Sequence, residues 1–209
     1  MRPAPQGASK AASGRRGRCA RRTSETRVAV EVNLDGAGRG RIASGLGFFD
    51  HMLETLARHS LVDLDVEGAG DLHVDEHHLV EDVGLALGEA LSEALGERRG
   101  IRRFGFVAPM DESLAEAAID LGGRPLLVFH ARFRRDRVGD LPTELVREFF
   151  RAVADRLRAT VHVRVRYGAN DHHKIEALFK AFAMALRAAC EADPRRGAEV
   201  PSSKGTLTA

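Results

Sequence analysis

An internal repeat is the feature that most constrains the fold of this 209-residue chain. Residues 75–81 read Asp-Glu-His-His-Leu-Val-Glu, and residues 170–176, 95 positions later, read Asn-Asp-His-His-Lys-Ile-Glu. Each segment places two adjacent histidines three and four residues before a glutamate, and each opens a run of apolar residues at helical spacing. Such repetition predicts two copies of one supersecondary unit that share a core.

The segments around each motif indicate the same order of elements in both halves. Alternating apolar and polar residues predict strands at 62–66 and 161–167, directly before the paired histidines. Helix-like segments at about 50–58 and 143–157 precede them, and further strands are expected at 27–34 and 125–133. The glycines at 36–40 lie between two strand-like segments and predict a hairpin turn. We expect strand, strand, helix, strand, helix in each half, an internally duplicated α+β fold.

Charge separates the first residues from the rest of the chain. Residues 1–22 carry seven basic side chains and no acidic one, whereas the remainder has a net charge of about −5. The composition of residues 1–22 predicts a disordered basic tail, or alternatively an organellar transit peptide. We expect half-domains at 23–107 and 108–193, and a loop at 194–209 that closes over the substrate. The folded part shows no basic stripe for nucleic acid.

Composition also excludes two classes of protein. A hydrophobic content of 44% is enough for one sizeable core, and no run of 18 apolar residues predicts a membrane span. The only cysteines are Cys19 and Cys190, and one of them lies in the tail. A structural disulfide is therefore not expected, and a reducing compartment, the cytoplasm, fits the chain.

The repeated His-His-x-x-Glu motif has the chemistry of a metal site. At a helix start its spacings place all three side chains near one face. Two imidazoles and a carboxylate suit Mn, Fe or Zn. A single copy also fits a capped surface helix, but two copies in matching places favour metal binding. The chain has no P-loop, no Gly-x-Ser-x-Gly elbow and no His-Glu-x-x-His motif.

Eight motifs together resemble the imidazoleglycerol-phosphate dehydratase family, in order and spacing, over about 22–207. They lie at residues 22–26, 49–53, 75–78, 81–84, 101–105, 123–125, 170–177 and 201–205. The resemblance implies two mixed β-sheets enclosing a helical bundle. It also implies a homo-oligomer built from trimers, with active sites between subunits and two Mn²⁺ ions in each site. The substrate would be a small phosphate ester.

The same resemblance assigns residues to the metals. The ligands carried over by position are His51, His77, His78, Glu81, His172, His173 and Glu176. The repeat partner of His51 is often a histidine in this family, whereas this chain has Glu148 there. A carboxylate also binds manganese, a hard ion. We therefore expect Glu148 as a ligand, with His162 or water as the alternative.

Substrate binding and catalysis follow from the resemblance as well. The phosphate is assigned to Arg103, Arg124, Lys180, Ser202, Ser203 and Lys204, and further substrate contacts to Glu25, His51 and Thr55. The catalytic carboxylates are Glu25, Glu81 and Glu176, with Glu25 the first candidate for proton transfer. The reaction dehydrates imidazole-glycerol phosphate to imidazole-acetol phosphate, with the ring held as an anion by metal.

Two other functions use the same residues. A dinuclear metal hydrolase would activate water against a phosphate ester with these ligand types. A metal-stabilised assembly protein would need the ligands but no reaction. Release of a ketone without free phosphate distinguishes the dehydratase from both.

Overall fold

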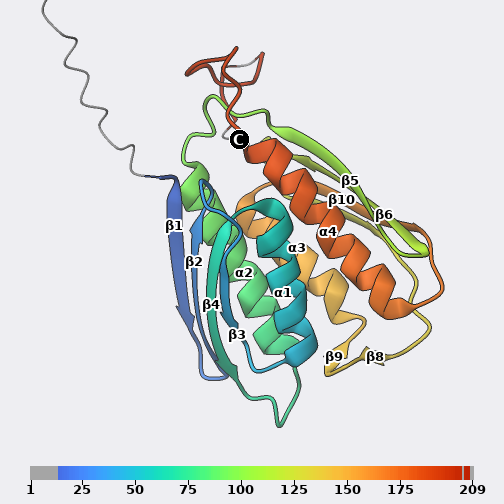
Figure 1. Ribbon diagram of the computed structural model, residues 1–209. Coiled ribbons are helices and arrows are strands. Elements are labelled where there is room, and N and C mark those ends of the chain that lie inside the picture. The colour runs from blue at the N-terminus through green and yellow to red at the C-terminus, as the bar shows by residue number, and fades with distance from the viewer. Residues whose placement is uncertain (1–13, 204, 208–209) are drawn as a thin grey trace, which may run out of the picture.

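The chain folds into two β-sheets with helices between them, as Figure 1 shows. The structure is a computed structural model that describes residues 14–203 and 205–207. The two main sheets have four strands each and are mixed, and a two-stranded ribbon lies apart from them. The expected α+β fold, internally duplicated with two mixed sheets around a helical bundle, is confirmed.

The first half has strand order β1-β2-β4-β3. Its elements are β1 (Arg16–Arg22), β2 (Thr26–Asn33), β3 (Gly40–Ala43), α1 (Gly47–Ser60), β4 (Asp63–Gly70) and α2 (His77–Leu95). Neighbouring strands are antiparallel except β3 and β4, which are parallel. Burial alternates along β2, so one face of this sheet meets the helices and the other faces out.

The second half repeats this topology with the order β5-β6-β10-β7. Its elements are β5 (Phe104–Met110), β6 (Ser113–Asp120), β7 (Leu126–His130), β8 (Arg137–Val138), β9 (Leu141–Pro142), α3 (Leu145–Leu157), β10 (Thr160–Tyr167) and α4 (Asp171–Cys190). One pair of neighbouring strands is again parallel: β7 pairs with β10, as β3 pairs with β4 in the first half. The ribbon β8-β9 is the one insertion relative to the first half within the described residues.

Aromatic side chains from both halves form one core. Phe149 of α3 lies 5.5 Å from Phe49 of α1 and 5.1 Å from Phe179 of α4, measured between ring centroids. All three side chains are fully buried. Two glycines let α2 and α3 approach closely: a Cβ at Gly84 would lie 2.9 Å from the Ala152 Cβ, and one at Gly88 would lie 2.7 Å from the Val153 carbonyl oxygen. The halves therefore cannot separate without exposing this shared core.

Strand β1 corrects the prediction of a disordered tail over residues 1–22. Residues 16–22 pair with β2 in a continuous antiparallel register from Arg16↔Asn33 to Arg22↔Arg27. Arg15 pairs with Asp35 at 2.6 Å, and Arg21 pairs with the mostly buried Asp82 at 2.9 Å. Two of the basic side chains that indicated disorder are thus paired with acidic side chains 20 and 61 residues further along the chain. Residues 1–13 of the predicted tail lie outside the described residues.

We expect Gly17→Ala to destabilise the protein by about 2–3 kcal/mol, because the added methyl group overpacks a tight contact. A Cβ at Gly17 would lie 2.0 Å from the Ala90 carbonyl oxygen of α2, so β1 must move away from the helix. Gly40→Ala in β3 is the matched control, since its nearest neighbour is a side-chain atom 3.5 Å away. Urea unfolding of both variants measures the effect. Equal midpoints would show that β1 contributes little to stability.

Two further predictions are wrong in detail. The boundary between the halves lies between Leu95 and Phe104, because β5 already belongs to the second sheet; the predicted boundary at 107/108 cuts through that strand. Residues 36–40 do not form a hairpin, because β4 lies between β2 and β3. Instead this loop wraps the first residue of β4: the backbone N–H groups of Ala37 and Arg39 donate to Asp63 at 2.9 and 3.1 Å.

The predicted absence of a membrane span agrees with the described helices, none of which combines the length and apolar character needed to cross a bilayer.

Candidate active site

Both paired-histidine motifs lie at the first turns of helices, as predicted. The Asp75 carboxylate accepts the His77 backbone N–H at 2.7 Å before α2, and the Asn170 side chain accepts the His172 N–H at 2.9 Å before α4. These caps satisfy N–H groups that have no partner inside the helix. They also fix where each helix begins, so the histidines face outward from the helix starts.

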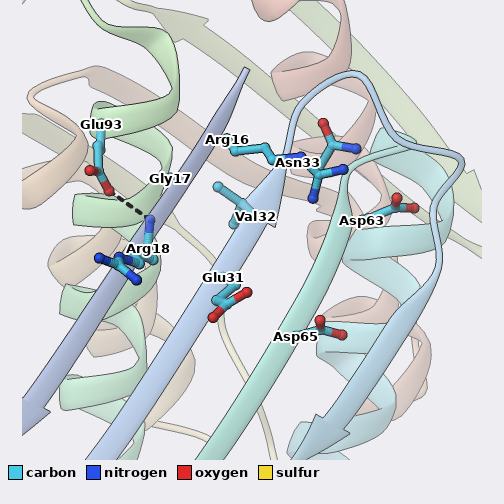
Figure 2. Close-up of a pocket in the computed structure, with 9 residues that line it drawn as sticks. All are labelled: Arg16, Gly17, Arg18, Glu31, Val32, Asn33, Asp63, Asp65 and Glu93. Atoms are coloured by element: carbon cyan, nitrogen blue, oxygen red, sulfur yellow. Dashed lines mark hydrogen bonds between the residues drawn. The ribbon is translucent and has the colours of Figure 1, made fainter. Parts of the chain in front are cut away.

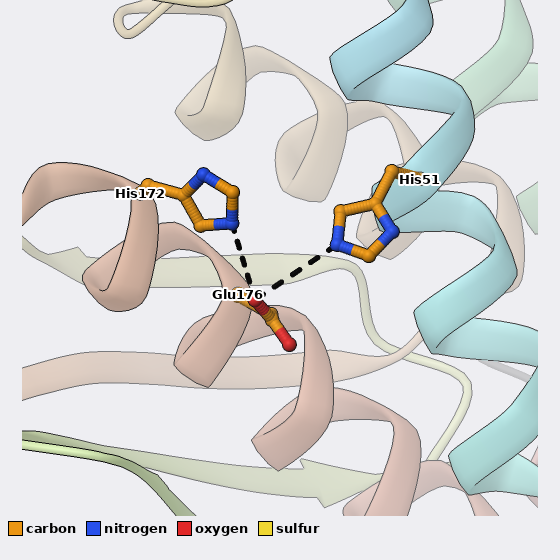
Figure 3. Close-up of side chains that lie close together, drawn as sticks. All are labelled: His51, His172 and Glu176. Carbon is orange, nitrogen blue, oxygen red and sulfur yellow. Dashed lines mark ion pairs between the residues drawn. The ribbon is translucent and has the colours of Figure 1, made fainter.

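Group A consists of His51 on α1 with His172 and Glu176 on α4. The His172 Nε2 lies 3.3 Å and the His51 Nε2 3.9 Å from the same oxygen of Glu176. Figure 3 shows the two rings approaching this carboxylate from different helices. The Glu176 side chain is only 10% exposed. Three donor atoms of the types that bind transition metals therefore meet at one point.

Charge keeps the Glu176 carboxylate ionised. Burial alone raises the pKa of Glu176, but the hydrogen bond and charge of Lys180, with His51 and His172 nearby, outweigh burial and leave this pKa below its ordinary value. The Lys180 Nζ lies 2.8 Å from the other carboxylate oxygen. A cation thus already stands beside the carboxylate that a metal would share.

Group B consists of His77 and Glu81 on α2 with Glu148 on α3, and it matches group A through the repeat. The Arg151 guanidinium bridges the two carboxylates, with Nε 2.6 Å from Glu148 and Nη2 2.5 Å from Glu81. Burial raises the pKa of Glu148, but Arg151, Arg147 and His77 together lower it below the usual value. Group B is therefore more open than group A, and an arginine joins its acidic ligands.

Group C consists of His78, Asp71 and Glu25. The His78 Nδ1 lies 3.3 and 3.4 Å from the two Asp71 oxygens and 3.6 Å from a Glu25 oxygen. The Asp71 carboxylate is the main cause of the raised pKa of His78, and Glu25 adds to it. Glu25 lies in the turn between β1 and β2, and its side chain is half exposed.

Group D consists of His173, Glu112 and Asp111. The His173 Nδ1 lies 2.6 Å from Glu112, and its Nε2 lies 3.8 Å from Asp111. Hydrogen bonds from the Asn170 backbone N–H, the His173 ring and the backbone N–H groups of Ala169 and Glu112 lower the pKa of Glu112 to about 2. Glu112 occupies the β5–β6 turn, the place that matches Glu25 between β1 and β2.

The expectation that all three side chains of each motif share one face is wrong for the second histidine. In the second motif His172 contacts Glu176, whereas His173 contacts Glu112, and in the first motif His78 contacts Asp71. Successive helix residues point about 100° apart, so offsets of three and four residues leave the axis on opposite sides of the glutamate. The rings of His172 and His173 accordingly stand 84° apart and contact different partners.

The phosphate-binding candidates Lys180 and Arg103 lie at different places along α4. Lys180 lies in group A, one turn beyond Glu176. Arg103 lies at the far end of α4, where its backbone N–H donates to the Ala189 carbonyl oxygen at 2.9 Å and its guanidinium contacts Asp120 and the Pro201 carbonyl oxygen. Figure 1 shows the C-terminal segment at this same end of α4.

The remaining candidates lie on several different elements. Arg124 precedes β7, where its carbonyl oxygen accepts from Thr160 at 3.2 Å. Ser202 and Ser203 follow the C-terminal segment that packs on Arg103, and Lys204 lies outside the described residues. Thr55 lies one turn after His51 on α1 and is buried. His162 lines a hollow on the outer face of the second sheet together with His130, away from the helices that carry group B.

A pocket of about 320 Å³ lies over β1, β2 and β4, and Figure 2 shows its lining. It contains none of the predicted site residues. Its carboxylates are committed elsewhere: Asp63 and Asp65 pair with Arg39 and Arg41 on the neighbouring strand. This hollow is a charged surface of the sheet, whereas the imidazole donors gather at the helix starts.

Sequence reasoning missed three groups that contact the predicted ligands. The Arg151 guanidinium contacts both carboxylates of group B. The Asp71 carboxylate contacts the His78 ring, and the Glu112 carboxylate contacts the His173 ring. None of them belongs to the His-His-x-x-Glu motif. The one available signal was the repeat itself, since Glu112 lies in the turn that matches the turn of Glu25.

Fold and site together define a duplicated α+β protein in which the imidazole and carboxylate donors of group A converge, the kind of set that holds divalent metals, while Arg151 bridges the carboxylates of the repeat-related group B. The model of the imidazoleglycerol-phosphate dehydratase family matches residues 44–186. The imidazoleglycerol-phosphate dehydratase of Sinorhizobium fredii is 53% identical over 194 residues, which is 92% of this chain and 96% of that protein.

Two solved structures agree with this match. The dehydratase of Staphylococcus aureus has a TM-score of 0.77 and 38% identity, covering 85% of this chain and 99% of that one. The enzyme of Pyrococcus furiosus has a TM-score of 0.77 and 35% identity, covering 90% and 99%. The chain belongs to the imidazoleglycerol-phosphate dehydratase family. It is thus a hydro-lyase with a dehydratase role in histidine biosynthesis, as the sequence motifs predicted.

Proposed function

We propose that this dehydratase depends on two Mn²⁺ ions and converts imidazole-glycerol phosphate to imidazole-acetol phosphate and water. The observation that carries the proposal is group A, where two imidazoles and a carboxylate from two helices converge within 4.8 Å. Because the fold is duplicated, group B supplies a second, matching set of donors.

The residues present fit divalent manganese. Imidazole and carboxylate ligands are those that Mn²⁺ accepts. Cationic side chains stand at the same carboxylates, Lys180 at Glu176 and Arg151 at Glu81 and Glu148, so these positions already stabilise positive charge. His51, His172 and Glu176 would hold one ion, and His77, Glu81 and Glu148 the other. The second histidines, His78 and His173, would complete these two sets from another copy of the chain. Bound metal supplies Lewis-acid stabilisation of the substrate ring as an anion.

The proton transfer is assigned to the Glu25 carboxylate. Glu25 is half exposed and lies 3.6 Å from the His78 ring, next to a predicted ligand. Its place in a turn is fixed by its own backbone, because the Glu25 carbonyl oxygen accepts the Asp71 N–H at 3.1 Å. A carboxylate held in this way moves a proton between the side chain of the substrate and water without a change in the backbone.

The active site is proposed to form between copies of the chain. Lys180 and Ala189, whose carbonyl oxygen accepts the Arg103 backbone N–H, are nine residues apart on α4, which is roughly 14 Å along the axis. The Arg103 guanidinium is held at the far end of α4 by Asp120 and the Pro201 carbonyl oxygen, so it does not join Lys180 at one phosphate within a single chain. A homo-oligomer in which Arg103, Arg124, Ser202, Ser203 and Lys204 of one copy approach group A of another satisfies both sets.

An assay of products tests the proposed reaction. Purified protein with Mn²⁺ and imidazole-glycerol phosphate should release a ketone and no inorganic phosphate. Phosphate release would instead support the dinuclear hydrolase, for which the same ligands would activate water. No turnover despite bound metal would support an assembly protein without catalysis.

Glu148→Ala should remove one of the two metals, because Glu148 is the α3 member of group B. His162→Ala is the control: His162 lines the outer face of the second sheet and should leave both ions bound. Glu148→His should keep both ions and shift the preference of that site toward softer metals such as zinc. Metal content after dialysis, measured by atomic emission, gives the count for each variant.

The opposite pattern would reassign the ligand. If Glu148→Ala retains two ions with unchanged affinity while His162→Ala loses one, the second-half set must be redrawn around His162.

We place the protein in the cytoplasm as a further part of the proposal. Both cysteines are unpaired, as expected in a reducing compartment. A transit peptide ending at residue 22 is disfavoured, because its removal would take away strand β1 of the first sheet.

A further inference from the structure

In each half, the turn between the first two strands places a carboxylate beside the second histidine of the His-His-x-x-Glu motif of that half. Glu25, between β1 and β2, lies 3.6 Å from the His78 Nδ1. Glu112, between β5 and β6, lies 2.6 Å from the His173 Nδ1. The positions match through the repeat, but only Glu112 is within hydrogen-bond distance of its ring.

A second carboxylate explains the difference. In the first half, Asp71 from the β4–α2 connection lies closer to the His78 Nδ1 than Glu25 does, with both oxygens within 3.4 Å. In the second half, the β10–α4 connection is Gly168-Ala169-Asn170 and has no carboxylate. Glu112 therefore takes the place at the His173 ring that Asp71 takes at the His78 ring.

The Glu112 carboxylate is held rigidly for this task. One of its oxygens accepts the backbone N–H groups of Ala169 and Asn170 at 3.1 and 2.9 Å. The other oxygen contacts the His173 Nδ1. The carboxylate thus links the start of α4 to the ring orientation of its second histidine.

This contact selects one tautomer. An ionised carboxylate accepts only, so the His173 Nδ1 carries the proton and donates it. The Nε2 of the neutral ring then keeps its lone pair, and a metal binds an imidazole through such an unprotonated nitrogen. The same reasoning applies to His78, whose Nδ1 faces Asp71.

We propose that the carboxylates of the two matching turns have different roles. Glu112 is a positioning residue that holds the His173 ring in the orientation and tautomer that bind metal, as Asp71 does for His78. Glu25, which is not needed at the His78 ring, transfers the proton. The inference rests on the proposed metal-dependent function. Glu112 and Asp71 therefore affect metal affinity, whereas Glu25 affects turnover.

The test titrates metal-free protein with Mn²⁺ and measures free Mn²⁺ by electron paramagnetic resonance. Glu112→Ala should weaken one of the two ions about 10–100-fold, the usual effect of removing an outer partner of a ligating histidine. Asp71→Asn should weaken an ion by a similar factor. Glu25→Gln should leave both affinities unchanged. Glu116→Gln, a surface carboxylate on β6 that pairs with Arg164 and Arg166, is the matched control.

A purely structural role for Glu112 predicts a different result. Glu112→Gln keeps one acceptor oxygen for the Ala169 and Asn170 N–H groups, so it should fold like the wild type. Its NH2 group would then face the His173 Nδ1, so the metal affinity should still fall as in Glu112→Ala. The proposed roles are wrong if Glu112→Ala lowers the melting temperature yet binds both ions with wild-type affinity. They are also wrong if Glu25→Gln lowers the Mn²⁺ affinity as much as Glu112→Ala does. Failure of the wild type to bind two ions would instead overturn the proposed function itself.

Discussion

Removal of divalent metal is expected to abolish dehydration, and Mn²⁺ is expected to restore it. The proton that is removed sits on a carbon next to the imidazole ring of the substrate. It is not acidic enough to be lost unless a positive charge stabilises the ring as an anion. Lewis-acid stabilisation is worth several kcal/mol, so turnover should fall at least about 10³-fold after chelation. Rates before dialysis against chelator, after it, and after Mn²⁺ addition give the measurement.

Two controls make the metal experiment specific. Circular dichroism should show the same helix content before and after chelation, because the aromatic core of Phe49, Phe149 and Phe179 involves no predicted ligand. Glu176→Gln should reproduce the loss with Mn²⁺ present, since it removes the charge shared by His51 and His172. Full activity in a sample shown to be free of metal would contradict the proposed mechanism.

The sequence predicted the helices and the inner strands well because these elements carry their own signals. Strand β2 alternates buried and exposed residues along its length, and α4 presents apolar residues at helical spacing. Strands β1, β5 and β6 were not predicted. β6 has its small buried residues Ser113, Ala115 and Ala117 where a strand normally shows large β-branched ones.

Strand β1 was missed for a different reason. Its sequence, RGRCARR, has no apolar alternation and indicates a solvated basic segment. Its stability comes from the backbone of β2 and from partners far along the chain: Gly17 packs against Ala90 of α2, and Arg21 pairs with Asp82, 61 residues further on. Local patterns do not contain such tertiary pairings, so residues of this kind are assigned only when the fold is known.

The same distinction holds at the candidate site. The paired histidines and their glutamates were predicted because motif, spacing and repeat coincide in the sequence. Arg151, Asp71 and Glu112 act from a different element than the histidine or glutamate they contact, at sequence separations that no motif records. The separation of Lys180 from Arg103 along α4 also appears only in three dimensions, and it supports the proposal that two copies share the active site.

Glu25→Gln should lower kcat about 10²–10⁴-fold, the usual contribution of a positioned general acid or base. Gln is nearly the same shape, so the turn between β1 and β2 should persist, but the amide cannot take up a proton. KM and metal content should change little, because Lys180 and the metal ligands of groups A and B lie on other elements. Steady-state kinetics with Mn²⁺ at saturation gives the two constants separately.

Glu31→Gln is the matched control for this substitution. Glu31 lies on β2 and lines the outer pocket of the first sheet, so it shares the strand that follows Glu25 but does not contact His78. Its kcat should equal that of the wild type. A Glu25→Gln enzyme with kcat within a factor of about three of wild type would show that another group transfers the proton. A loss confined to KM would instead make Glu25 a substrate-binding residue, and the half-exposed carboxylate beside His78 would then act in recognition.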